Sequence, residues 1–177
     1  RFAVAIEKRG AEIAQTVSMQ NGMPITLAEQ LETGYTVTLL RYYAGLAATL
    51  QLEESRPSPL GFTTLVRKEP VGVIGAIVPW NVPVTLSMMK IGPAFAAGCT
   101  IVLKPSPETV LDSYLVAAAA AEAGIPPGVI NWVPGGRDLG AYLVSHPGID
   151  KVAFTGSTVA GRMIAAECGR LLRPVRQ

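Results

Sequence analysis

One stretch, residues 71–104, constrains the fold of this chain more than any other. It begins with an apolar, β-branched run over residues 71–78, which is typical of a strand buried on both faces of a parallel sheet. A helical pattern follows over residues 85–97, and a second apolar run covers residues 99–103. Two strands joined by a helix within about 30 residues predict a βαβ unit with a right-handed crossover.

Strand and helix patterns continue to alternate after this unit. They predict a helix over 107–123, a strand over 129–133, a short helix over 139–145, a strand over 151–154 and a helix from 157 to about 167. Such alternation is typical of an α/β fold with a doubly wound, mostly parallel, Rossmann-like sheet. Ligands of these sheets bind beyond the carboxyl ends of the strands, so residues 79–81 and 104–106 are candidates for a binding site.

A helical segment precedes the sheet. Apolar residues at helical spacing predict one amphipathic helix over residues 1–20. Thr26 and Glu29 match a capping box, which predicts a long second helix from there to about residue 54. Residues 62–69 alternate loosely and favour a strand or one arm of a hairpin.

Composition restricts the kind of molecule this can be. The chain has 177 residues, 49% of them apolar and 16% charged, which favours one domain with a real core. A net charge of +2 indicates no nucleic-acid partner, and no uncharged apolar run reaches the roughly 18 residues of a membrane helix. Two distant cysteines indicate a reducing compartment, which we take to be the cytoplasm. The lone histidine, His146, has no cluster of ligands near it in sequence, so we expect no metal site.

Three common nucleotide-binding signatures are absent from the sequence. The chain has no G-x-G-x-x-G, no G-x-x-x-x-G-K-[ST] and no Tyr-x-x-x-Lys pair. If a nucleotide binds, its phosphates must be held in another way.

Three other motifs, in order, carry a resemblance to a known family. They are VPWNVP at 78–83, GCTIVLKPSPET at 98–109 and FTGS at 154–157. Over residues 70–175 their order and spacing resemble the coenzyme domain of the NAD(P)-dependent aldehyde dehydrogenase superfamily. The resemblance implies oxidation of a small-molecule aldehyde to a carboxylate, with NAD or NADP as cofactor. It also implies three parts: a helical segment (1–60), a strand or linker (61–70) and an NAD(P)-binding Rossmann-like domain (71–177).

The resemblance also implies roles for single residues. Asn81 matches the family's catalytic asparagine, whose side-chain amide can donate to the oxygen that becomes negative during attack on an aldehyde. Asparagine is also common in turns, so a purely structural role stays open. Lys104 matches the lysine that contacts the adenosine ribose or its phosphate, although a lysine at a strand end can simply be solvated. The remaining positions that match the cofactor site are Ile77, Val78, Pro79, Trp80, Ser106, Gly136, Gly140, Phe154, Thr155, Gly156, Ser157 and Ala160.

Ser157 has a physical reason of its own to bind phosphate. It precedes a predicted helix, where free backbone amides and the helix dipole favour an anion, and serine is also a common N-cap. The family often has a glutamate three residues after the lysine, to bind the ribose hydroxyls. This chain has Pro107 at that position, so the choice between NAD and NADP stays open.

The family's nucleophilic cysteine and general-base glutamate have no counterpart in these residues. Cys99 precedes a buried strand and Cys168 lies near a helix C-terminus, where a thiolate is disfavoured. We therefore expect a truncated chain, a fragment that is inactive alone and comes from an enzyme that is a homo-oligomer at full length. The alternative is a catalytically inactive, truncated subunit that binds a partner.

Overall fold

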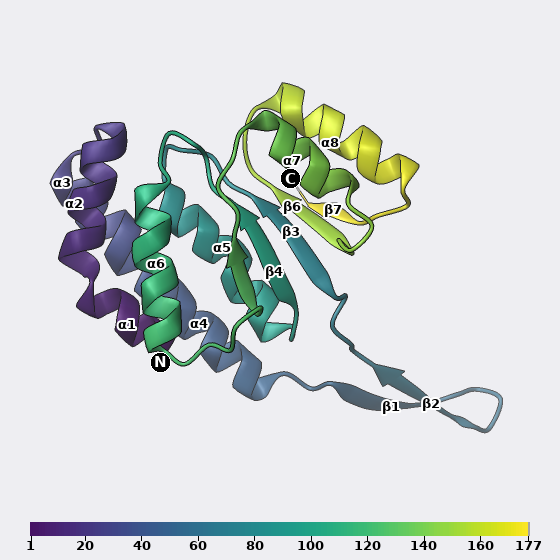
Figure 1. Ribbon diagram of the computed structural model, residues 1–177. Coiled ribbons are helices and arrows are strands. Elements are labelled where there is room, and N and C mark those ends of the chain that lie inside the picture. Colours follow the sequence, from purple (N-terminus) through teal and green to yellow (C-terminus); the bar gives the residue numbers. More distant parts are fainter. Residues whose placement is uncertain (177) are drawn as a thin grey trace.

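The computed structural model describes residues 1–176. Its elements are α1 (Phe2–Lys8), α2 (Gly10–Asn21), α3 (Ile25–Ala28), the π-helix η1 (Glu29–Tyr35), α4 (Thr36–Thr49), β1 (Glu53–Pro57), β2 (Thr63–Arg67), β3 (Val73–Ile77), α5 (Pro83–Ala96), β4 (Thr100–Lys104), α6 (Leu111–Glu122), β5 (Ile130–Trp132), α7 (Arg137–Ser145), β6 (Lys151–Phe154), α8 (Thr158–Arg170) and β7 (Val175–Arg176). Helices cover both faces of a central sheet, and the β1–β2 hairpin extends away from the rest of the molecule (Figure 1).

The central sheet confirms the predicted doubly wound α/β fold. Its five strands run in the order β5-β4-β3-β6-β7, and every pair is parallel. Ile77 at the end of β3 pairs with Lys104 of β4 and with Phe154 of β6, so these three strands end at the same level. The chain proceeds from β3 to β5 in one direction and places β6 and β7 on the other side of β3. Such a reversal is where open α/β sheets bind their ligands.

Each face of the sheet has its own core. On one face, α5, α6 and the N-terminal helices bury one large cluster against the sheet, including Ile6, Ile13, Ile74, Met88 and Ile101. On the other face, α7 and α8 bury a smaller cluster that includes Ile77, Leu143, Val152, Phe154 and Cys168. The N-terminal helices therefore share a core with the sheet, and the division at residues 60 and 70 stays a prediction.

The N-terminal helices differ from the sequence prediction in detail. The helix predicted over 1–20 is divided into α1 and α2 at Arg9, whose backbone (φ −96°, ψ 8°) leaves the helical region. The capping box was wrong: α3 begins at Ile25 with Pro24 as its N-cap, so Thr26 already lies inside the helix. The continuous helical run also includes the π-helix η1 and ends at Thr49 rather than near residue 54.

Three further boundaries follow from pairing or local bonds rather than from periodicity. The strand predicted over 62–69 is present as β2, but its partner β1 lies partly where helix was expected and is exposed throughout. The helix predicted over 107–123 begins later, as α6 at Leu111, and the backbone amide of Thr109 donates to the Ser106 carbonyl (3.2 Å) in a turn that precedes it. The short edge strand β7 was not predicted.

Replacement of two helical glycines by alanine is expected to change the free energy of unfolding in opposite directions. A Cβ at Gly92 of α5 would lie 2.5 Å from Tyr43 Cδ2, whereas a Cβ at Gly45 of α4 would meet no atom within 4 Å. We expect Gly92→Ala to lower the free energy of unfolding by about 1–3 kcal/mol through overpacking. Gly45→Ala is expected to raise it by about 0.5–1 kcal/mol, because alanine loses less backbone entropy in a helix. Urea unfolding measures both, and shifts of the same sign would contradict the close packing of α4 on α5.

Candidate functional site

A pocket of about 720 Å³ opens where the sheet reverses direction, between α7 and α8. Its floor is made by the strand-end residues Ile77, Lys104 and Phe154, which the register brings side by side. The two helices supply its walls. The wall residues are Arg137, Gly140, Ala141, Tyr142, Val144 and Ser145 from α7, and Ser157, Val159, Ala160, Met163, Ile164 and Glu167 from α8 and its N-cap.

The structure divides the predicted site residues into two groups. Those that line the pocket are Ile77, Lys104, Gly140, Phe154, Ser157 and Ala160. Those that lie outside its lining are Val78, Pro79, Trp80, Asn81, Ser106, Gly136, Thr155 and Gly156. All of them except Gly140 and Ala160 lie on loops, strand ends or N-caps at the edge where β3, β4 and β6 end, or immediately beyond it. Their roles toward a cofactor stay predictions.

Lys104 is a buried lysine rather than a solvated one. The residue is only 6% exposed, and Nζ donates hydrogen bonds to the carbonyls of Pro105 (2.7 Å) and Gly135 (2.8 Å). Burial lowers the pKa of Lys104, and the charge of Glu108 acts in the opposite direction. An ammonium group has three N–H donors, and two of them form the hydrogen bonds to these carbonyls.

Ser157 is the N-cap of α8, as its sequence position indicated. Its Oγ accepts a hydrogen bond from the backbone N–H of Ala160 (3.3 Å). The preceding Gly156 follows the Phe154 ring so closely that a Cβ there would lie 2.5 Å from Cζ. A side chain at 156 would therefore displace the phenylalanine that forms part of the pocket floor. The first amides of α8 have no partner within the helix, which makes this end suitable for an anion.

The turn that carries Asn81 is held by a residue that the sequence reading missed. The side-chain amide of Asn21, at the end of α2, donates to the carbonyls of Trp80 (3.0 Å) and Asn81 (3.3 Å). Asn21 Oδ1 also accepts from the amide of Met23 (3.0 Å), which fixes the orientation of its side chain. Both Trp80 and Asn81 are exposed. Nothing in the local sequence indicates that Asn21 contacts residues 80 and 81.

A second missed residue, Glu32, caps the helix that follows this turn. Glu32 is fully buried in η1, and its Oε2 accepts from the backbone N–H of Thr85 in the first turn of α5 (2.9 Å). Its other oxygen, Oε1, meets no hydrogen-bond donor among residues 1–176. Burial raises the pKa of Glu32 to about 7, although the Thr85 amide acts in the opposite direction. Glu32 lies within the π-helix, where the 3.6-residue period of an α-helix does not hold, so periodicity does not reveal that this side chain is buried.

Thr155 faces a second, smaller pocket on the other face of the sheet. Its hydroxyl accepts a hydrogen bond from Lys90 Nζ of α5 (2.7 Å), and both residues line a cavity of about 310 Å³. Burial, together with the charge of Arg176, lowers the pKa of Lys90 to about 8. A lone lysine within the apolar run of α5 was the sequence signal for this site.

Cys99 and Cys168 lie in the hydrophobic cores, and His146 takes part in a turn. Cys99 and Cys168 are both buried free thiols, and burial raises the pKa of Cys168. His146 Nδ1 accepts from the backbone N–H of Gly148 (3.0 Å) within a turn. Within residues 1–176, no group of three or more His, Cys, Asp or Glu side chains is placed to hold a metal ion. In the same residues no helix is both long and apolar enough to cross a membrane.

Comparison with known proteins gives the family. Residues 1–176 match the model of the aldehyde dehydrogenase family. The chain belongs to this family. It is 69% identical over 175 residues to the geranial dehydrogenase of Castellaniella defragrans, and that alignment covers 99% of this chain and 37% of the relative. It is also 42% identical over 181 residues to the phenylacetaldehyde dehydrogenase of Pseudomonas fluorescens, with 99% of this chain and 36% of that protein covered.

Solved aldehyde dehydrogenases have the same fold. The NAD+ complex of the Bacillus cereus enzyme superimposes with a TM-score of 0.94 at 42% identity, over 98% of this chain and 35% of that one. The NAD+ complex of the Mycobacterium tuberculosis enzyme gives a TM-score of 0.91 at 39% identity, over 98% and 37% of the two chains. This chain therefore spans a little over a third of the length of the aldehyde dehydrogenases that it matches.

Proposed function

We propose that this chain supplies the cofactor site of an NAD(P)-dependent oxidation of an aldehyde to a carboxylate. One observation supports this most directly. The ends of β3, β4 and β6 and the N-terminus of α8 converge on one pocket at the point where the sheet reverses direction. That is where α/β sheets bind dinucleotides.

The residues of the pocket fit the adenosine half of a dinucleotide. The pocket volume of about 720 Å³ lies within the range of cofactor sites. Lys104 has one ammonium proton left for a ribose hydroxyl, and the N-terminus of α8, with the amides of Thr158 and Val159, can receive the pyrophosphate. Gly140 keeps the space above Lys104 open, because a Cβ there would fill it at contact distance (3.6 Å from Lys104 Cε). In this proposal residues 79–81, which follow β3 beyond the pocket residue Ile77, contact the reacting end of the cofactor.

In this proposal the chain contributes binding and one catalytic group. NAD(P)+, when bound, supplies the acceptor for the hydride of the substrate. Asn81 donates its side-chain N–H to the substrate oxygen as negative charge develops on that oxygen. Asn21 and Glu32 hold the turn and the helix on either side of Asn81, so the backbone that carries this donor is held in place. We also propose that the substrate is a small-molecule aldehyde, that the enzyme is cytoplasmic and that it is a homo-oligomer at full length.

The nucleophile and the general base lie outside this chain in our proposal. Neither buried cysteine opens onto the 720 Å³ pocket, and a raised thiol pKa at Cys168 disfavours the thiolate. We expect the chain alone to oxidise no aldehyde, and formation of reduced cofactor by the pure chain would contradict this. The alternative, an inactive partner-binding subunit, is favoured by the projecting β1–β2 hairpin, where Leu60, Phe62 and Leu65 are exposed.

Calorimetric titration with NAD+ and NADP+ in parallel tests the proposed cofactor site. We expect saturable binding of at least one dinucleotide to the wild-type chain. Lys104→Met should weaken this binding by about tenfold or more, because a charge-assisted hydrogen bond in a buried site is lost. Lys151→Met, at the opposite end of the sheet, is the matched control and should leave the affinity unchanged. Absence of binding of both dinucleotides would refute the proposed cofactor site.

A further inference from the structure

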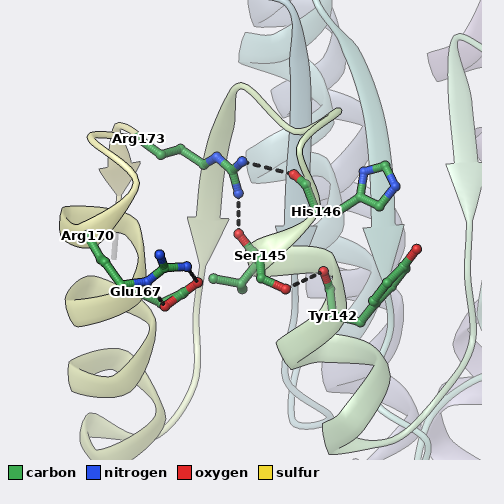
Figure 2. A network of polar contacts seen from close by, with 7 residues as sticks. Tyr142, Ser145, His146, Glu167, Arg170 and Arg173 are labelled. Carbon is green, nitrogen blue, oxygen red and sulfur yellow. Dashed lines mark hydrogen bonds and ion pairs between the residues drawn. The ribbon is translucent and has the colours of Figure 1, made fainter.

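Arg173 joins the two helices that form the walls of the pocket. It lies between α8 and β7, and its backbone N–H donates to the carbonyl of Cys168 in the last turn of α8 (2.8 Å). Its guanidinium extends to the end of α7, where it donates to the carbonyl of Val144 and, through Nη2, to the carbonyl of His146 (2.9 Å). Figure 2 shows this side chain reaching across from the segment after α8.

The chemistry of this contact makes it specific for arginine. The last carbonyls of a helix have no donors within the helix, and a cation is favoured beside them. A guanidinium presents donors in a rigid planar fork, so one group can bond to two carbonyls at once. The carbonyls of Val144 and His146 belong to the last turn and C-cap of α7, so Arg173 fixes the position of that turn.

This contact lies near one end of the pocket, where the last turns of its two wall helices meet. Both helices begin at the edge of the sheet near Lys104 and Phe154, so their C-termini lie at the opposite end, where Arg173 is. Val144 and Ser145 of α7 face Ile164 and Glu167 of α8 in the pocket lining near that end. Within residues 1–176, no strand lies between the two C-terminal turns to fix their separation, because α7 and α8 lie on the same face of the sheet (Figure 1).

We propose that Arg173 is a positioning residue for cofactor binding, which sets the width of the pocket for the adenosine half of the dinucleotide. The inference rests on the proposed function, since it takes the pocket to be the adenosine site. A residue that acts only at this end should affect ligands that contain adenosine and leave ligands with only the nicotinamide half unaffected.

The test compares three ligands on folded variants of the chain. Arg173→Lys keeps the positive charge but cannot bond to both carbonyls. We therefore expect it to weaken the binding of NAD+ and of AMP by the same factor of about ten. Nicotinamide mononucleotide should bind to the variant and the wild type alike. Arg173→Gln, which keeps a short amide donor, is a second variant for which the same loss is expected. Arg162→Lys, on the exposed surface of α8, is the matched control and should bind all three ligands like the wild type.

The outcomes separate this inference from the proposal beneath it. If the variants lose thermal stability but bind AMP with wild-type affinity well below their melting temperature, Arg173 is only structural and the inference is overturned. Equal weakening of AMP and nicotinamide mononucleotide would also overturn it, because the effect would not be confined to the adenosine end. If the wild-type chain binds neither NAD+, NADP+ nor AMP, the proposed function itself fails and this inference fails with it.

Discussion

Asn81→Ala is expected to lower kcat by about 10²–10³-fold in an enzyme that contains this chain, with little change in the KM for NAD+. The reason is that a side-chain amide held in a fixed turn stabilises the negative oxygen of the transition state more than it stabilises the bound aldehyde. The turn is fixed on one side by Asn21 and on the other by the Glu32 cap on α5. Replacing Asn81 by alanine removes the side-chain donor and leaves the contacts of Asn21 and Glu32 in place.

A chimaera makes this measurement possible. Residues 1–176 can replace the matching segment of the Castellaniella defragrans geranial dehydrogenase, because the two sequences are 69% identical. Asn81→Asp keeps the shape without an N–H donor and should be as slow as the alanine variant. Asn131→Ala is the control, since its amide bonds to the Gly128 carbonyl (2.9 Å) away from the site. A kcat within about threefold of the parent chimaera for Asn81→Ala would rule out an oxyanion role.

Glu32 is expected to make the stability of the chain depend on pH. Burial raises its pKa from 4.5 to about 7, so the folded state binds this proton more tightly than the unfolded chain does. The stabilisation is complete below pH 4.5 and is lost as the pH rises to about 7, which amounts to about 3 kcal/mol. Asp112, whose pKa burial raises to about 6, contributes in the same direction.

Comparison with Glu32→Gln isolates the contribution of Glu32. The glutamine keeps an oxygen for the Thr85 amide and does not titrate. The free energy of unfolding of the variant, relative to that of the wild type, should therefore rise by about 3 kcal/mol between pH 4.5 and pH 8. Urea unfolding at several pH values, followed by tryptophan fluorescence, measures this difference. Glu29→Gln, an exposed glutamate of the same π-helix, should leave the pH dependence unchanged. Parallel stability curves for the wild type and Glu32→Gln would show that the buried carboxylate is not the titrating group.

Much of the central sheet could be predicted because its signals are local. An apolar run between glycine and proline punctuation located β3, β4, β5 and β6 to within two residues at each end, and Ser157 was recognised as an N-cap from its position alone. Signals in the N-terminal segment were weaker. The capping box at Thr26 failed because Pro24 had already set the backbone for a helix starting at Ile25. The strand β1 was missed because EESRP has no alternation of apolar and polar residues to indicate it.

Short runs of sequence were enough to predict the parallel sheet, the edge at which we propose that a ligand binds, and the family, since the meaning of each run does not change with its surroundings. The side chains that support that edge could be identified only from the way the helices and strands pack together. Asn21 lies 59 residues before its acceptor at Trp80, and Glu32 lies 53 residues before Thr85. Arg173 reaches back 29 residues to Val144. Such contacts depend on how separate elements pack, because the two partners of each hydrogen bond come from different parts of the chain, and no local pattern records where the partner is.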